Sequence, residues 1–534
     1  MLLRLELEKQ RRLGVVYTPS EVALELTKFA LAKLGTPTQT ILEPSVGDGA
    51  FLRAIEEVRT CNVKIQGVDI DPAAILSLGN EFPYAEFQCG DFINYAVNYD
   101  GPGFDLIIGN PPYIRWRNLD SSLRESVTHL SEITGYPLSE LKNAWAAFVV
   151  ASNLLLRDGG VLAFIVPYEL LNVKYGQRLQ AFLAETFEKV EIFIPNDKAF
   201  RQLDQDAVAL VATKSSAGVC VGVELSLVKT LSELIPIKTR EVHFDEKHVS
   251  NVDLNSVFFD GETAELLHKL RNSLKSILDY ASSSAGVVSA ANSFFILTAS
   301  ELDERELRSW ARPILQKGAY LPAGPIFSKE HLIEILDEES AFLLDFIQEN
   351  TPPLSPAALR YIAEGQALGL DKRYKSRHRT PWYNIPIVNP SDGIFFKRSH
   401  SFPRLCANEA RVLVTDTAYQ VRMLDGFSIR DLCYSFYNSL TLLFCEMDGR
   451  FYGGGVLELT PTEFRGVPIH FRVPREQEFQ EFLQNFPKSK TPELANFEFA
   501  DMRLAQQLGL SDVEILRIRE ALTTVRSHRL RHAS

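Results

Sequence analysis

In the first part of the chain, short apolar runs of strand length alternate with segments whose apolar residues have helical spacing. Regular alternation of this kind is typical of parallel strands joined by helices that cover both faces of one sheet. We therefore expect an α/β, doubly wound, mostly parallel sheet of seven strands, at residues 40–44, 64–69, 85–92, 104–109, 161–167, 189–194 and 207–213.

The fourth of these runs is the most informative. Its residues 104–108 are rich in Leu, Ile and Phe, as in a central strand buried on both faces, and an Asn-Pro-Pro-Tyr turn follows at residues 110–113. Proline has no backbone N–H to donate, so two consecutive prolines end the strand. The turn should hold the Asn110 side chain and the Pro111 carbonyl stiffly at the carboxyl edge of the sheet, where open α/β sheets bind ligands.

Three earlier strands end in acids, at Glu43, Asp69 and Asp91, and a Gly47-Asp48-Gly49 turn follows the first strand. A glycine turn with an acid roughly 20 residues further on is also found in NAD-binding folds, but those have a third glycine beside the pyrophosphate. S-adenosylmethionine has no pyrophosphate. It needs an acceptor for its amino group, a carboxylate for its ribose and a polar group for its adenine amine, and the three acids suit it.

The Asn-Pro-Pro-Tyr turn suits a second, planar substrate that carries an amino group. An aromatic amine is a poor nucleophile because its lone pair is delocalised into the ring. If Asn110 and the Pro111 carbonyl accept its two hydrogens, the lone pair is freed for direct displacement at a sulfonium methyl group. A base within a duplex would first be flipped out and held between apolar faces, for which Tyr113 and Phe200 are the candidates.

Beyond residue 214 the pattern changes to shorter strand-like runs mixed with helices. We expect a first domain at residues 1–245 and a second, mixed α+β domain at residues 246–534 that ends in a helical region from residue 492 to about 526. No internal repeat is evident, and the pattern does not identify the fold of the second half.

The net charge of −12 over 534 residues argues against nucleic-acid binding when it is averaged over the chain, but binding requires only a local basic face. Residues 357–411 contain ten Arg or Lys and four Asp or Glu, interleaved with aromatic residues. This stretch is either a solvated loop or a basic surface that contacts phosphates.

The six cysteines are scattered without a CxxC pair, which argues against a zinc site or a disulfide framework and fits a cytoplasmic protein. No apolar run is long enough for a transmembrane helix, and we expect no contact with membranes and no metal.

With these motifs assembled, the chain resembles the γ class of adenine-N6 DNA methyltransferases, the modification enzymes of Type II restriction systems. The resemblance rests on motifs that occur in the family's order, at residues 17–19, 43–51, 69–71, 91–92 and 110–113. It covers residues 14 to about 214 and implies a Rossmann-like methyltransferase domain followed by a target recognition domain. Ser45-Val46 stands where the family usually has Ala-Cys or Ala-Ala.

The resemblance also implies roles for individual residues. S-adenosylmethionine would be contacted by Thr18, Glu43, Pro44, Ser45, Gly47, Asp69, Ile70, Asp91, Phe92 and Pro112. A flipped adenine would be held by Asn110, Pro111, Tyr113 and Phe200. Double-stranded DNA would be contacted, at phosphates or guanines, by Arg373, Lys375, Arg377, Arg379, Lys397 and Arg398.

Three other functions compete with adenine-N6 methylation of DNA. One is a methyltransferase with the same Asn-Pro-Pro-Tyr motif that acts on an RNA base or a protein glutamine, but the glutamine enzymes are shorter and place their extra domain before the catalytic one. A NAD-dependent oxidoreductase would leave Asn110 unexplained, and an inactive DNA-binding module would not need residues 110–113. We expect a monomer, with any cleavage of the same DNA site left to a separate restriction endonuclease.

Overall fold

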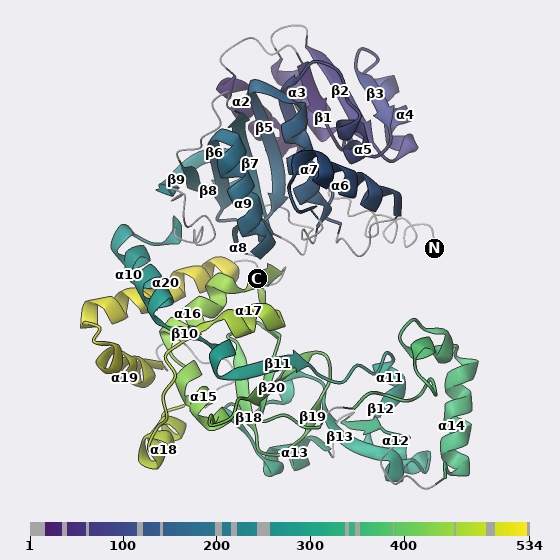
Figure 1. The fold of residues 1–534 in the computed structure, drawn as a ribbon, viewed down its shortest axis with the longest axis vertical. Coiled ribbons are helices and arrows are strands. Elements are labelled where there is room, and N and C mark those ends of the chain that lie inside the picture. The colour runs from purple at the N-terminus through teal and green to yellow at the C-terminus, as the bar shows by residue number, and fades with distance from the viewer. Residues whose placement is uncertain are drawn as a thin grey trace. The chain divides into compact units, whose positions relative to one another are not determined.

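The computed structural model describes residues 17–34, 40–59, 63–114, 121–138, 143–172, 174–197, 206–214, 222–242, 257–336, 341–347, 353–387, 389–452, 455–486 and 497–530. The chain forms two compact units (Figure 1). The first comprises Met1–Asp260, Arg450–Gly455 and Leu530–Ser534, and the second comprises Gly261–Gly449 and Val456–Arg529. The unit boundary thus falls after Asp260, whereas we expected residue 245, and the roles given to the two parts remain predictions.

The first unit is built on one large sheet. Strands β1 to β5 pair in parallel in the order β3-β2-β1-β4-β5, and β7 lies antiparallel between β5 and β6. The strands are β1 (Thr40–Glu43), β2 (Lys64–Asp69), β3 (Glu86–Cys89), β4 (Phe104–Gly109), β5 (Leu156–Pro167), β6 (Phe187–Pro195), β7 (Ala207–Lys214), β8 (Val223–Thr230) and β9 (Glu233–Val242).

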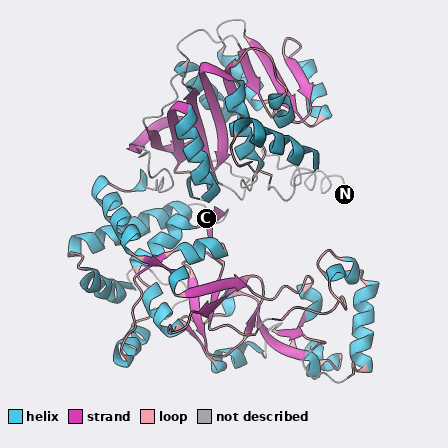
Figure 2. Cartoon of the chain, viewed as in Figure 1, coloured by secondary structure: helices cyan, strands magenta, loops and turns pink. Residues whose placement is uncertain are grey.

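Helices lie on both faces of this sheet, which confirms the α/β, mostly parallel arrangement (Figure 2). On one face, Leu26 and Phe51 belong to the same apolar core as Ile41 and Ile108 of the central strands. Elsewhere Phe92 of α5 packs on Phe148 of α7, with ring centroids 4.9 Å apart. The helices are α2 (Ser20–Lys33), α3 (Ala50–Val58), α4 (Pro72–Glu81), α5 (Phe92–Val97), α6 (Ser121–Thr134), α7 (Ala144–Leu155), α8 (Glu169–Asn172) and α9 (Lys174–Thr186).

The number of strands differs from our expectation. Within the described residues the sheet has nine strands, not seven, because β8 pairs in parallel with β6 and β9 pairs with β8 as an antiparallel hairpin. Most of β9 is exposed, including Ile235 and Ile237, so this edge hairpin does not show the apolar run that marks a buried strand.

The second unit contains several small sheets and many helices. Its largest sheet has the strand order β11-β20-β16-β18-β14, and a second sheet has the order β12-β15-β13-β19. Its strands are β10 (Lys275–Ser276), β11 (Ala281–Ala285), β12 (Ile296–Leu297), β13 (Ala311–Leu315), β14 (Ile326–Phe327), β15 (Phe342–Leu344), β16 (Gly393–Phe396), β17 (Arg398–Ser399), β18 (Arg404–Asn408), β19 (Leu413–Val414), β20 (Ala418–Met423), β22 (Val456–Glu458) and β23 (Pro468–Ile469).

Helices of the second unit come from its whole length. They are α10 (Gly261–Ser273), α11 (Asn292–Phe295), α12 (Ala299–Glu304), α13 (Lys329–Leu336), α14 (Pro356–Ala367), α15 (Ile429–Phe436), α16 (Ser439–Asp448), α17 (Pro461–Gly466), α18 (Glu476–Gln484), α19 (Glu498–Leu508) and α20 (Asp512–Leu530). The expected C-terminal helical region is therefore present as α19 and α20.

A buried ion pair anchors α20. Arg529, with 1% of its surface exposed, donates from Nε and Nη2 to the two carboxylate oxygens of Glu446 on α16, each at 2.7 Å. Its Nη1 also donates to the carbonyl of His400 at 2.8 Å. The amphipathic pattern of the last helix gave no sign of this bond, because an arginine in a helical sequence is normally solvated.

Replacing Arg529 with Met should lower the stability of the second unit by about 3–5 kcal/mol, since it leaves the Glu446 carboxylate buried and unpaired. The midpoint of urea unfolding and hydrogen exchange along α20 would measure the loss. As a control, Arg360→Met breaks the exposed ion pair with Glu306 and should cost less than about 1 kcal/mol. Equal losses of stability in the two variants would contradict the conclusion that the buried ion pair between Arg529 and Glu446 anchors α20.

Candidate functional site

The loop after β1 depends on two glycines. Gly47 and Gly49 have φ angles of +51° and +86°, and a Cβ on Gly49 would lie 2.5 Å from Leu78 Cδ2. The loop is held against the neighbouring strand, because the Val46 N–H donates to the Val68 carbonyl at 3.1 Å. The glycine turn therefore keeps the backbone of residues 45–49 close to the end of β2.

Asp69, at the end of β2, organises this loop. Its Oδ2 accepts from the Gly47 N–H at 2.9 Å and its Oδ1 accepts from the Asp71 N–H at 2.8 Å. Burial raises the pKa of Asp69, although these backbone hydrogen bonds oppose the shift. Each oxygen retains a second lone pair for a ligand hydroxyl. Ile70, the next residue, is 54% exposed and offers an apolar face at the same edge.

Glu43, at the end of β1, is a buried acid. It is 1% exposed, and its Oε2 has no hydrogen-bond partner among the residues that the structure describes. Burial raises the pKa of Glu43 well above its ordinary value, and the nearby carboxylates of Asp69 and Asp48 raise it further, against a smaller opposing effect of Arg53. A carboxylate in this position would be stabilised by a cationic ligand.

The third acid, Asp91, begins α5. Its Oδ1 accepts from the Ile93 N–H at 2.9 Å, which caps the helix. Phe92, which we expected to contact a cofactor, is 2% exposed, and its ring packs on Phe148 inside the unit. The main contact of Phe92 is therefore packing within the core of the unit.

Three segments meet at Asn110, directly after β4. The Asn110 Nδ2 donates to the Thr18 hydroxyl at 3.1 Å, and the Ser45 hydroxyl donates to the Asn110 carbonyl at 3.1 Å. Pairing between β1 and β4 places Pro44 beside Gly109, where a Cβ would lie 3.4 Å from Pro44 Cδ. The structure therefore brings together Thr18, Ser45 and Asn110, which lie far apart in the sequence.

The rest of the turn is also fixed. Pro111 is buried, and Pro112 is partly buried. The Tyr113 hydroxyl donates to the Ile165 carbonyl of β5 at 3.3 Å, and burial raises the pKa of Tyr113 well above its usual value. The sequence motif could not reveal this contact with β5, because the acceptor is a backbone carbonyl. Phe200, the expected second stacking residue, lies outside the described residues.

The predicted DNA-contacting residues in the second unit fall into two groups. Arg373 donates to the Ala290 carbonyl at 3.1 Å, and Arg379 donates to the carbonyls of Ser289 and Val288 at 2.9 and 2.7 Å. Arg398 forms an ion pair with Glu458. By contrast, Lys375, Arg377 and Lys397 form no ion pair within the described residues. Lys375 and Arg377 are exposed, as are Arg373 and Arg398, and Lys397 is partly exposed.

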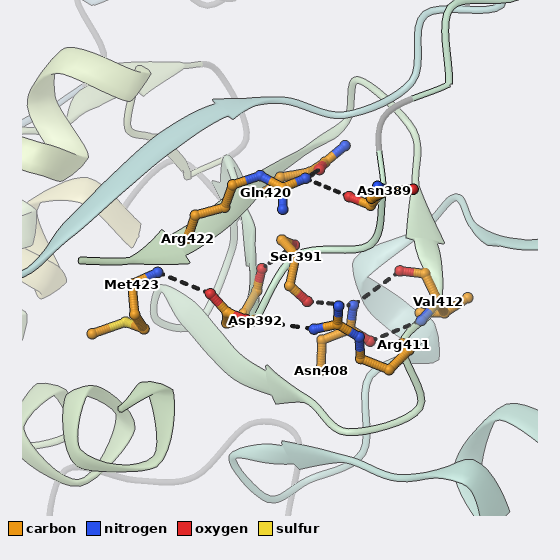
Figure 3. Close-up of polar contacts among 10 residues, drawn as sticks. Asn389, Ser391, Asp392, Asn408, Arg411, Val412, Gln420, Arg422 and Met423 are labelled. Carbon is orange, nitrogen blue, oxygen red and sulfur yellow. Dashed lines mark hydrogen bonds and ion pairs between the residues drawn. The ribbon is translucent and has the colours of Figure 1, made fainter. Parts of the chain in front are cut away.

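Figure 3 shows a polar network at one end of β16, β18 and β20 that sequence reasoning missed. Asn408 holds the turn after β18, since its Nδ2 donates to the Val412 carbonyl at 2.9 Å and its Oδ1 accepts from the Val412 N–H at 3.0 Å. The Asp392 carboxylate accepts from Met423 N–H at 3.0 Å and from Arg411 at 3.4 Å. The residues of this network are ordinary hydrogen-bonding types that form no sequence motif, so the sequence alone did not reveal it.

Among the described residues, no helix is both long and apolar enough to cross a membrane. Nor does the described part of the chain hold a group of three or more His, Cys, Asp or Glu side chains suited to a metal ion.

Comparison with known families places the chain in a class. Residues 80–200 match the model described as Eco57I restriction-modification methylase, and residues 252–498 match the C-terminal domain of Type II methyltransferase M.Eco57I. These two regions span more than half of the chain. The chain belongs to the Eco57I-type restriction-modification methylases.

Two relatives align with most of this chain, and a third aligns with a shorter region. Type II methyltransferase M.AccI from Acinetobacter calcoaceticus is 22% identical over 507 residues, which is 91% of each chain. M.XamI from Xanthomonas campestris pv. amaranthicola is 23% identical, over 86% of this chain and 85% of its own. M.TthHB8I from Thermus thermophilus is 36% identical over 180 residues, 33% of this chain and 39% of its own.

Among solved structures, the Type IIL restriction-modification enzyme MmeI, determined in complex with DNA, has a similar fold. The TM-score is 0.55 at 12% sequence identity, and the match covers 98% of this chain and 76% of that one.

Burial of Glu43 predicts a specific pH dependence of stability. Its folded-state pKa is raised, so the folded protein holds the proton more tightly than the unfolded chain does. Stability is therefore lost as the pH rises from the unfolded pKa of about 4.5 towards the raised folded value. Without ligands, Glu43→Gln should be about 1–3 kcal/mol more stable than the parent at pH 8.

Thermal unfolding at pH 4, 6 and 8 would test this, with Glu57→Gln, an exposed acid on α3, as the matched control. The advantage of Glu43→Gln should shrink at pH 4, where the parent's carboxyl is protonated. A constant advantage at all three pH values would show that the buried charge is not its cause.

Proposed function

We propose that this chain is an S-adenosylmethionine-dependent DNA methyltransferase that modifies the N6 amino group of a flipped-out adenine in double-stranded DNA. The observation that carries the proposal is the meeting of Thr18, Ser45 and Asn110 beside the strand-end acids Glu43 and Asp69. The family membership supports methyl transfer within a restriction-modification system, and the relatives' names supply methyl transfer as their activity.

The residues at the sheet edge fit S-adenosylmethionine. The buried Glu43 Oε2 lacks a partner among the described residues and suits the ligand's ammonium group. Asp69 has lone pairs left for ribose hydroxyls, and exposed Ile70 offers an apolar surface for the adenine ring. S-adenosylmethionine supplies an electrophilic methyl group on a sulfonium. The proposed cofactor set is completed by Thr18, Pro44, Ser45, Gly47, Asp91 and Pro112, with Phe92 supporting it from the core.

Asn110 and Pro111 would act on the target amine. Because Asn110 Nδ2 donates to Thr18, the orientation of the amide is fixed and its Oδ1 serves as the acceptor. Oδ1 and the Pro111 carbonyl accept the two hydrogens of the amino group, which frees the nitrogen lone pair from the ring. The nitrogen would bond to the methyl group as the bond from that methyl to the sulfonium breaks, and it would then lose one proton to solvent. Tyr113, fixed by its hydrogen bond to β5, provides a face on which the base stacks. The rate gain comes from orientation and from fixed dipoles.

The second unit would recognise the DNA sequence, and the enzyme would act as a monomer. Cleavage of the same site would require a separate restriction endonuclease.

Asn110→Ala should still bind S-adenosylmethionine but lose methyl transfer to DNA by at least about 100-fold, because it removes one acceptor of the reacting amine. Calorimetry would measure cofactor binding, and transfer of labelled methyl groups to plasmid DNA would measure activity. Asn94→Ala, an exposed residue of α5, is the matched control and should keep full activity. Substantial transfer by Asn110→Ala would rule out the proposed role.

Sequencing of DNA from cells that express the chain, by a method that detects N6-methyladenine, would identify the methylated base and its sequence context. Methylated adenines in one short sequence context are expected. Methyl transfer to RNA or to protein glutamine, with no methylated DNA, would overturn the proposed substrate.

Binding of the cofactor should release protons, because its ammonium group lowers the raised pKa of Glu43. Calorimetry at pH 6 in buffers with different ionisation enthalpies would count them. Glu43→Gln should bind the cofactor at least about tenfold more weakly and without this release. Identical proton release by the variant would assign it to another group.

A further inference from the structure

The basic loop of residues 369–379 in the second unit is anchored by buried residues and by its own backbone hydrogen bonds. Gly369 has a φ of +71°, and Leu370 next to it is 4% exposed and belongs to the apolar core. Ser376, in the middle of the loop, is 1% exposed. Backbone hydrogen bonds from Arg377 N–H to the Arg373 carbonyl at 3.0 Å and from Arg379 N–H to the Ser376 carbonyl at 3.0 Å close the loop on itself.

Two arginines of the loop are committed to holding it. Arg373 and Arg379 donate to three successive carbonyls, those of Ala290, Ser289 and Val288, at 3.1, 2.9 and 2.7 Å. Burial lowers the pKa of Arg379, in keeping with its partly buried guanidinium. These two side chains tie the loop to residues 288–290 and are therefore positioning residues.

Other side chains of the loop face solvent. Tyr374 is 72% exposed, although a tyrosine ring usually buries much of its surface. The Arg377 guanidinium lies 5.1 Å from the centroid of the Tyr374 ring, and the His378 ring lies 4.9 Å from it. His378 Nδ1 lies 2.6 Å from the Tyr374 carbonyl, to which it donates. The exposed ring is thus held in place by two neighbours on its own loop.

The loop that carries this ring is rich in positive charge. Lys372, Lys375 and Arg377 are exposed, and none of them forms an ion pair with a carboxylate in the described part of the chain. Residues 371–379 contain five Arg or Lys and one Asp, in a chain whose net charge is −12. A concentrated positive charge that the protein does not neutralise is complementary to a polyanion.

We propose that Tyr374 is a DNA-contacting side chain that packs on a base or sugar of the duplex while Lys372, Lys375 and Arg377 contact the flanking phosphates. This proposal rests on the proposed function, since it requires DNA as the substrate. An exposed aromatic ring on a loop rich in cations can bind a nucleic acid by stacking and by phosphate contacts together. Arg373 and Arg379, which the sequence suggested as DNA contacts, act through the loop instead.

The two kinds of contact respond differently to salt. A phosphate contact releases counterions, so each one contributes about 0.9 to the slope of log affinity against log salt concentration. Stacking of an uncharged ring contributes to affinity without changing this slope. Salt titrations of DNA binding can therefore separate Tyr374 from its cationic neighbours.

The experiment measures binding of the full chain to a labelled duplex by fluorescence anisotropy, at several salt concentrations. Tyr374→Ala should bind about tenfold more weakly with an unchanged salt slope, and Tyr374→Phe should bind like the parent. Lys375→Ala and Arg377→Ala should each reduce the magnitude of the slope by about 0.9. Lys329→Ala, an exposed lysine at the start of α13, is the matched control and should change neither quantity.

Arg379→Ala should weaken binding without changing the salt slope, and it should also increase hydrogen exchange of residues 288–290. Tyr374→Ala should leave that exchange unchanged, which separates a positioning role from a contact.

Parent-like affinity and slope in the Tyr374, Lys375 and Arg377 variants would overturn the proposal. If those variants still methylate DNA as the parent does, the proposed function stands and the DNA face lies elsewhere. A parent that binds RNA but not duplex DNA would overturn both proposals.

Discussion

The hydrogen bond between Asn110 and Thr18 is the constraint on which the candidate site depends. It fixes the side-chain amide of a residue that follows β4, while the Ser45 hydroxyl fixes the carbonyl of the same residue. The Ser45 bond requires β1 and β4 to be neighbours, since Ser45 follows β1 and Asn110 follows β4. The parallel pairing of two central strands therefore places the Asn110 backbone, and Thr18, just before α2, orients its side chain.

The same edge carries an electrostatic cost. Glu43 is buried with an oxygen that no described residue satisfies, and its neighbours Asp69 and Asp48 are also acids. A core selected for stability alone would not keep this arrangement, because a buried carboxylate is normally paired. The cost is explained if the site is completed by a cation, so that the protein without ligand is less stable than it could be.

The sequence predicted the first unit well for physical reasons. β4 is buried along its whole length, so its apolar run is continuous, and Asn-Pro-Pro-Tyr marks its end without ambiguity. The glycines of the first loop are required by positive φ angles and by contact with Leu78, which makes them visible as a motif. The edge hairpin β8–β9 was missed because most of β9 is exposed and polar. Contacts made by backbone carbonyls, such as that between Tyr113 and Ile165, carry no sequence signal.

The second unit was harder to predict because its strands are short and pair over long sequence distances. Ile326–Phe327 pairs with residues 407–408, and two apolar residues do not show a period. The charges of the basic stretch were visible in the sequence, but their roles were not. Arg373 and Arg379 donate hydrogen bonds to carbonyls 83 to 91 residues away in the sequence. The side chains of Lys375 and Arg377 are exposed to solvent.

This division of the basic residues follows from geometry within a single loop. Like charges crowded on one loop repel each other, and here two of the cations hold the backbone in place. Arginine suits that task because its guanidinium can reach two carbonyls at once, as Arg379 does with Ser289 and Val288. The remaining cations can then stay exposed around Tyr374 without loosening the loop. A count of positive charges in this stretch therefore overestimates the number of cationic side chains without a partner in the described part of the chain.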